Sequence, residues 1–177
     1  GGVSISRTAR VFPTYLIFKP AMFITAFFLI QYWRFNSDLM GKICPHLNYK
    51  KIFLFFGVGS AIFLILHSIF LGVKFDNDFY KLFRRVLVLF FIIFEVIAQT
   101  ILVINLYKIK EQIKKFINSR ILNIKIILVS ILVVVAFVSI PFLVAEGYNS
   151  FKHALEWNYF MGVISFYLLT FFFWKKQ

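Results

Sequence analysis

Long apolar stretches alternate with short polar connections along the chain. A helix needs about 20 mainly apolar residues to cross the hydrocarbon core of a bilayer. Five windows meet this test: residues 12–33, 52–73, 86–107, 124–144 and 158–174. The pattern therefore predicts an all-α integral membrane protein, a bundle of five transmembrane helices. Pro20 lacks an N–H and kinks helices, so the first helix starts either near residue 12 or nearer Ala21.

The composition supports a membrane location. Hydrophobic residues make up 61% of the chain and the mean hydropathy is +0.85, whereas soluble domains are about 45–50% apolar. The 20 Lys and Arg residues outnumber the 7 Asp and Glu residues, an excess that is also typical of nucleic-acid-binding proteins. Because the cations fall between the apolar windows, we interpret them as charges that face anionic lipid headgroups, and we expect no nucleic-acid partner.

The distribution of Lys and Arg predicts an orientation. These residues are more frequent in the connections 34–51 and 108–125 and in the C-terminal tail than on the opposite side. The positive-inside rule then places the C-terminus in the cytoplasm. The beginning of the chain would lie outside or in a lumen, as expected if a sixth span preceded residue 1. The Lys-rich segment 108–115 is either an amphipathic continuation of the third helix along the membrane surface or a solvated loop.

No internal repeat or polar linker divides the sequence, so we predict one domain, residues 1–177. The second window contains small residues that would let a neighbouring helix approach closely: Gly57, Gly59, Ser60 and Ala61. Cys44 is the only cysteine, which excludes an intrachain disulfide and a Cys-based zinc site. We expect neither a metal nor a cofactor.

Glu95 lies near the middle of the third window, and Gln99 follows one turn later on the same helix face. A charged side chain at the centre of a membrane helix costs about 2.5–3.5 kcal/mol on insertion scales, so it needs a partner or a task. Either the pair lines a polar cavity, or a protonated Glu95 bonds a neighbouring helix. We favour the structural interpretation, because one carboxyl is weak evidence of a pathway.

His67 lies in the second window, near its predicted outer end. Four acidic residues fall on the same predicted side: Asp76, Asp78, Glu146 and Glu156. Together they could hold a metal, act as acid and base or bind a cationic headgroup. The alternative is a packing histidine beside hydrated loop charges, with Glu156 stabilising the start of the last helix. No HExxH, GxSxG, Walker or paired-His motif is present, so the sequence does not favour catalysis.

Three segments carry a resemblance to a known family. They are Ser4-Ile5-Ser6 with Pro13, Ile17-Phe18-Lys19, Ala26 and Tyr32-Trp33; then Asp76-Asn77-Asp78-Phe79; then Ala145-Glu146-Gly147-Tyr148 with Phe151 and Ala154-Leu155-Glu156-Trp157. Together they resemble the membrane proteins related to the post-GPI-attachment lipid-remodelling factor and the FGF-receptor-activating protein, the Frag, DRAM and Sfk type.

The resemblance implies six spans with both ends cytoplasmic, of which this chain would lack the first. It implies lipid remodelling of GPI-anchored proteins in the endoplasmic reticulum or Golgi, with membrane lipids and GPI-anchored proteins as partners. Thr14, Lys19 and Ala145 stand where the family has an acidic residue, an Arg and a Cys, which puts a headgroup contact near the first helix in doubt. The positions that the resemblance transfers as important, without a role, are Glu146 and Glu156.

We therefore expect a non-channel membrane protein that handles lipid or a lipid-anchored client from the luminal or exterior side. In a bacterial source the GPI role does not apply and general lipid handling remains. One alternative is a structural or accessory subunit of a larger membrane complex, with other membrane subunits as partners. A second alternative is an ion or proton pathway through Glu95, which lacks the series of polar residues that a conduction route needs.

Overall fold

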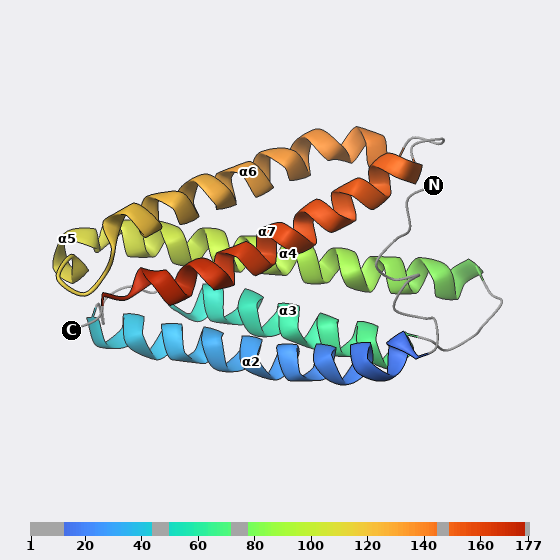
Figure 1. Ribbon diagram of the computed structural model, residues 1–177, viewed down its shortest axis with the longest axis horizontal. Helices are drawn as coiled ribbons and strands as arrows, with labels where there is room; N and C mark the ends of the chain where they lie inside the picture. Colours follow the sequence, from blue (N-terminus) through green and yellow to red (C-terminus); the bar gives the residue numbers. More distant parts are fainter. Residues whose placement is uncertain (1–12, 44–49, 72–77, 145–148, 176–177) are drawn as a thin grey trace. The chain divides into compact units, whose positions relative to one another are not determined.

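The computed structural model describes residues 13–43, 50–71, 78–144 and 149–175. These residues form helices and no strand: α2 (Thr14–Ile43), α3 (Lys50–Phe70), α4 (Asp78–Lys108), α5 (Lys110–Ile113), α6 (Ser119–Val144) and α7 (Asn149–Phe173) (Figure 1). Four stretches are long and apolar enough to cross a bilayer: Leu16–Ile43, Ile52–Phe70, Leu82–Lys108 and Ser119–Ser139. A shorter apolar stretch, Trp157–Phe173, lies in α7. The chain is an all-α integral membrane protein with several spans, which confirms the predicted fold class.

Most helices continue beyond the apolar windows that predicted them. The helix α4 has 31 residues and begins at Asp78 rather than Val86. At 1.5 Å per residue it is about 46 Å long, whereas the hydrocarbon core of a bilayer is about 30 Å thick. The extra turns stay helical because backbone hydrogen bonds do not depend on side-chain polarity.

The helix α2 begins at Thr14 and contains Pro20. A start near Ala21 is therefore wrong, and the helix also continues ten residues beyond the predicted end at Trp33, to Ile43. Proline has no backbone N–H, so one hydrogen bond of the helix is missing at Pro20, but the turns on either side keep their hydrogen bonds. A single proline in a membrane helix is tolerated for this reason.

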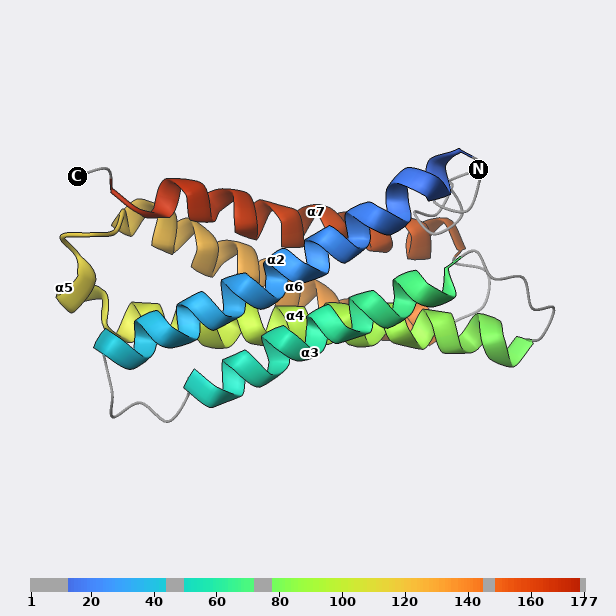
Figure 2. The same cartoon turned by 90° about the horizontal axis from the view of Figure 1, so that it is seen from below.

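The chain divides into two compact units. The N-terminal unit, Ile5–Ala98, contains α2, α3 and the first part of α4. The C-terminal unit contains Gln99–Gln177, with the last turns of α4 and all of α5, α6 and α7. Within the first unit α2 and α3 pack side by side and antiparallel, as α6 and α7 do within the second (Figures 1 and 2). The single domain expected from the sequence stays a prediction.

In the N-terminal unit, α3 faces α4 through phenylalanine rings. Aromatic residues recur every seven positions on α3, which places them on one helix face, as in a coiled-coil seam. The closest ring pairs, with their centroid distances, are Phe63–Phe94 at 5.0 Å, Phe56–Phe94 at 5.1 Å, Phe63–Phe90 at 5.2 Å and Phe70–Phe83 at 5.3 Å. Packing and dispersion between these rings hold the two helices together in a lipid environment, where the hydrophobic effect contributes little.

Two glycines of α3 make room for rings from both of its neighbours. A Cβ atom on Gly57 would fall within the indole ring of Trp33 on α2. A Cβ atom on Gly59 would lie 2.7 Å from the ring of Phe94 on α4. The small-residue patch of α3 therefore receives an aromatic ring on each side, and Trp33 is completely buried there.

The connection between α4 and α6 in the C-terminal unit is amphipathic. Three isoleucines four positions apart are buried: Ile109, Ile113 and Ile117. Of the lysines between them, Lys114 and Lys115 are exposed and Lys110 is half-buried. This arrangement supports the amphipathic interpretation of the Lys-rich segment over a fully solvated loop.

Candidate functional site

The buried carboxyl of Glu95 is bonded within the N-terminal unit. The Ser60 hydroxyl on α3 donates to Glu95 Oε2 on α4 at 2.7 Å, and both side chains are fully buried. Gln99, one turn further along α4, is also fully buried. The hydrogen bond from Ser60 supports the structural interpretation of Glu95, in which the carboxyl links two helices.

A second polar group gathers where α3 ends. The carbonyl oxygens of a helix C-terminus lack partners within the helix, and here two neighbouring helices supply donors. Lys19 Nζ on α2 donates to Ile69 O at 3.4 Å, and Tyr80 Oη on α4 donates to Phe70 O at 2.7 Å. The positive charge of Lys19 also complements the negative end of the helix dipole.

His67 and Ser68 lie just inside this helix end. Both are buried, and the Ser68 hydroxyl donates to Leu64 O at 2.8 Å. The imidazole of His67 therefore lies one turn from the carbonyls that Lys19 and Tyr80 reach. We name Lys19, His67, Tyr80 and Arg84 the α3-end cluster.

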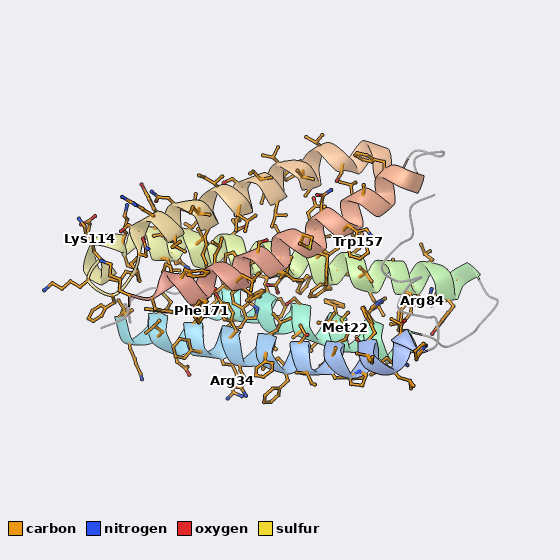
Figure 3. All side chains as sticks on the ribbon, in the orientation of Figure 1. Met22, Arg34, Arg84, Lys114, Trp157 and Phe171 are labelled. Atoms are coloured by element: carbon orange, nitrogen blue, oxygen red, sulfur yellow. The ribbon has the colours of Figure 1, made fainter. Side chains whose placement is uncertain are left out.

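Arg84 completes the α3-end cluster from α4. Its guanidinium carbon lies 5.6 Å from the centre of the Tyr80 ring, a cation–π distance. The side chain is half-buried, and among the described residues its Nε has no hydrogen-bond partner although it is shielded from water. In Figure 3 Arg84 lies toward the same end of the N-terminal unit as Met22 of α2. A shielded guanidinium N–H of this kind calls for an acceptor.

The structure places only part of the site expected from the sequence. His67, Glu95 and Gln99 are described and buried. Asp78 and Glu156 lie in the first turns of α4 and in α7, but their side chains are outside the described part of the chain, as are the whole of Asp76 and Glu146. The grouping of His67 with these acids stays a prediction. Among the described residues no cluster of three or more His, Cys, Asp or Glu could hold a metal ion.

In the C-terminal unit, the position of Lys125 differs from the one that the sequence predicts. We grouped it with the cations of the connection 108–125, but it lies inside α6 with 1% of its surface exposed. Its Nζ donates to Thr170 Oγ1 on α7 at 2.7 Å. The same nitrogen lies 4.2 Å from the ring centre of Phe166 and 5.3 Å from that of Phe173. Packing explains this burial, since the long apolar stem can run along α7 while the amine bonds a hydroxyl.

Sequence patterns gave no direct signal for three of these residues. Tyr80 and Arg84 precede the window of the third span, where the hydropathy rule treats them as a loop. Lys125 stands one residue inside the fourth window, where a flanking cation is ordinary. For Tyr80 and Arg84 an indirect signal is their spacing, since residues four apart lie on one face of a helix; Lys125 has no such signal.

Comparisons with protein families, curated proteins and solved structures give no match for this chain. A functional proposal therefore has to rest on the contacts of the α3-end cluster and on the three sequence segments.

Proposed function

We propose that this chain is a multi-pass membrane protein that binds a lipid headgroup at the α3-end cluster and so handles lipid or a lipid-anchored client. The observation that carries this proposal is the guanidinium of Arg84, whose shielded Nε lacks an acceptor among the described residues. A phosphate of a lipid headgroup supplies such an acceptor, and planar guanidinium groups are well suited to phosphate oxygens.

The neighbours of Arg84 fit the same ligand. Lys19 adds a second cation, and its long 3.4 Å bond to Ile69 O leaves its ammonium other donors to offer. Tyr80 holds the guanidinium against its ring while its hydroxyl is tied to Phe70 O. The cluster thus combines two cations at the end of a membrane helix, the depth at which headgroups lie.

The finer part of the proposal comes from the resemblance. In a eukaryotic source, we propose that the client is a GPI-anchored protein and that the chain acts in the endoplasmic reticulum or Golgi. On the positive-inside rule, we propose that the C-terminus lies in the cytoplasm and the α3-end cluster on the luminal side. Glu146 and Glu156 are the further positions that this resemblance marks.

Lipid retention tests the binding step. The full chain is purified in mild detergent and its bound lipids are identified by native mass spectrometry. Arg84→Gln should lower the retained lipid about ten-fold, which corresponds to about 1.4 kcal/mol. The matched control is Arg34→Gln, which removes an exposed arginine from α2 and should retain lipid as the natural chain does. Equal retention by both variants, or a natural chain free of lipid, would overturn the proposal.

One further variant separates folding from binding, and an assay in cells separates the general role from the GPI role. Tyr80→Phe removes the bond to Phe70 O but keeps the ring under Arg84, so it should lower thermal stability more than lipid retention. In cells depleted of the chain, GPI-anchored proteins should carry unremodelled lipid, restored by Arg34→Gln but not by Arg84→Gln. Unchanged GPI lipids together with normal lipid retention would leave only the general role.

A second candidate function is an accessory subunit that docks through α2. Of the four long apolar stretches among the described residues, the one in α2 is the least covered, with 17% of its window buried. It exposes a row of large apolar residues: Phe23, Ile24, Phe27, Phe28 and Phe35. Stoichiometric partners that co-purify with the natural chain, and that are lost on replacing Phe27 and Phe28 by Ala, would favour this function over lipid handling.

A further inference from the structure

The end of the C-terminal unit is held together by backbone hydrogen bonds. Asn118 N donates to Phe173 O at 2.8 Å, and Lys175 N donates to Phe116 O at 2.9 Å. Lys175 Nζ also donates to Lys114 O at 3.1 Å. The segment before α6 is therefore fixed to the end of α7, which positions the side chains that both segments carry.

The side chains on this end are strongly basic. Glu111 is the one acid of the connection 108–120, and it pairs with Lys114 at 3.5 Å, where both side chains are more than half exposed. The exposed cations are Lys108, Lys114, Lys115, Arg120 and Lys175. We call these five residues the basic rim. Figure 3 shows Lys114 at the turn that follows α5.

Exposed aromatic residues lie among the same segments. Phe116 is 51% exposed and Trp174 is 38% exposed. Trp174 forms the backbone bridge with Ile117, and Phe116 is next to Ile117. Aromatic side chains beside cations are typical of the layer where lipid headgroups meet the hydrocarbon core. This combination is typical of a surface that lies against a membrane rather than in bulk water.

Lys125 places a buried amine next to the segments that carry the rim. Its ammonium has a hydroxyl and two ring faces around it, and no carboxylate lies within ion-pair distance among the described residues. Phe173, which covers this ammonium, is also the residue whose carbonyl closes the bridge to Asn118. Lys125 and the rim therefore belong to one structure. A buried ionisable side chain without a counter-ion in a membrane helix is a sign of function.

We infer that the basic rim and Lys125 form a binding site for the headgroup of an anionic phospholipid in the adjacent leaflet. The rim contacts the headgroup, and Lys125 adds positive potential from below, where the low dielectric strengthens it. Clusters of four to eight Lys and Arg next to a membrane helix recognise anionic lipids in this way. The site lies in the C-terminal unit and is separate from the α3-end cluster proposed above.

A titration of the full chain with lipids tests the inference. Binding of phosphatidylglycerol and of phosphatidylcholine with the same acyl chains is measured by native mass spectrometry. The natural chain should prefer phosphatidylglycerol, and Lys115→Gln with Arg120→Gln should reduce this preference about ten-fold. The matched control is Arg34→Gln with Lys42→Gln, an exposed arginine and lysine of α2, and it should keep the preference. No preference in the natural chain, or equal loss in both pairs, would overturn the site.

Further measurements distinguish a lipid headgroup from free phosphate as the ligand and test whether Lys125 contributes to the site. Millimolar inorganic phosphate should not displace phosphatidylglycerol; displacement would mean that the site takes free phosphate. Lys125→Met removes the charge and keeps a side chain of similar length, so the preference should fall while the protein stays folded. An unchanged preference in this variant would remove Lys125 from the site. Arg84→Gln should lower total lipid retention but keep the ratio of bound phosphatidylglycerol to bound phosphatidylcholine, which distinguishes this site from the α3-end cluster.

Discussion

The Ser60 hydroxyl and the Glu95 carboxyl bond each other at 2.7 Å between α3 and α4, in a region where both side chains are fully buried. The same hydroxyl lies 2.7 Å from Gly57 O. A hydroxyl has one hydrogen and cannot donate to both oxygens at once. A protonated carboxyl would complete both contacts, donating to Ser60 while Ser60 donates to the carbonyl.

This relationship predicts that Glu95→Gln is well tolerated. The amide of Gln has a similar size and its N–H can donate to Ser60. We expect the free energy of unfolding in detergent to change by less than about 0.5 kcal/mol, whereas Ser60→Ala should lower it by about 0.6–1.7 kcal/mol, the range of hydrogen bonds between membrane helices. Proton flux into liposomes should be the same for Glu95→Gln and the natural chain. A loss of flux in that variant would favour the pathway alternative.

The surroundings of Gly57 on α3 and Gly162 on α7 predict that substitution by Ala lowers the free energy of unfolding by different amounts. Gly57→Ala would place a methyl group within the indole of Trp33, a rigid ring buried on all sides. Gly162→Ala would place one 2.6 Å from Leu132 Cδ2, the end of a side chain that can rotate. We expect Gly57→Ala to cost about 1–3 kcal/mol, as overpacking does, and Gly162→Ala clearly less. Thermal unfolding in detergent measures both, and a larger cost at Gly162 would contradict the packing around Trp33.

Hydropathy predicts that the helices exist but not where they end. The window rule counts apolar residues, so it stops α2 at Trp33 and starts α4 at Val86, while both helices continue through charged turns. The limit is physical, because leaving the hydrocarbon changes which side chains are favourable but not whether the backbone can stay helical. The fold class follows from composition, and the helix ends need the structure.

The polar contacts are harder to predict because their partners are far apart in sequence. Glu95 is noticeable in the sequence, yet its partner Ser60 lies 35 residues earlier and reads as part of a small-residue patch. Lys125 meets Thr170 45 residues later, and a lysine near a helix end gives no sign of burial. Polar residues that need a partner can therefore be found from the free energy that their insertion into a membrane costs. Which residue becomes the partner depends on helix packing.

The contact between Lys125 and Thr170 predicts a coupling between two substitutions. Thr170→Val keeps the shape and removes the hydroxyl that the ammonium bonds, so it should cost about 1.5–3 kcal/mol, as for hydrogen bonds to charged groups. In a Lys125→Met background the same change should cost much less, because no buried charge loses a partner. Lys125→Met alone should be neutral or stabilising, as replacement of buried charges often is. Equal costs of Thr170→Val in both backgrounds, measured by unfolding, would show that the two residues do not interact.

The two ends of α4 predict the topology of the chain. A helix of 31 residues is longer than the hydrocarbon core is thick, so Phe79 and Lys108 should emerge on opposite membrane faces. Both are exposed, and each can be replaced by Cys in a Cys44→Ser background, where it would be the only thiol. From the excess of Lys and Arg we expect an impermeant maleimide to label Phe79→Cys from the outer or luminal side, and Lys108→Cys only from the cytoplasmic side. The reverse pattern would overturn the orientation but keep the span. Labelling of both from one side would mean that α4 does not cross the membrane.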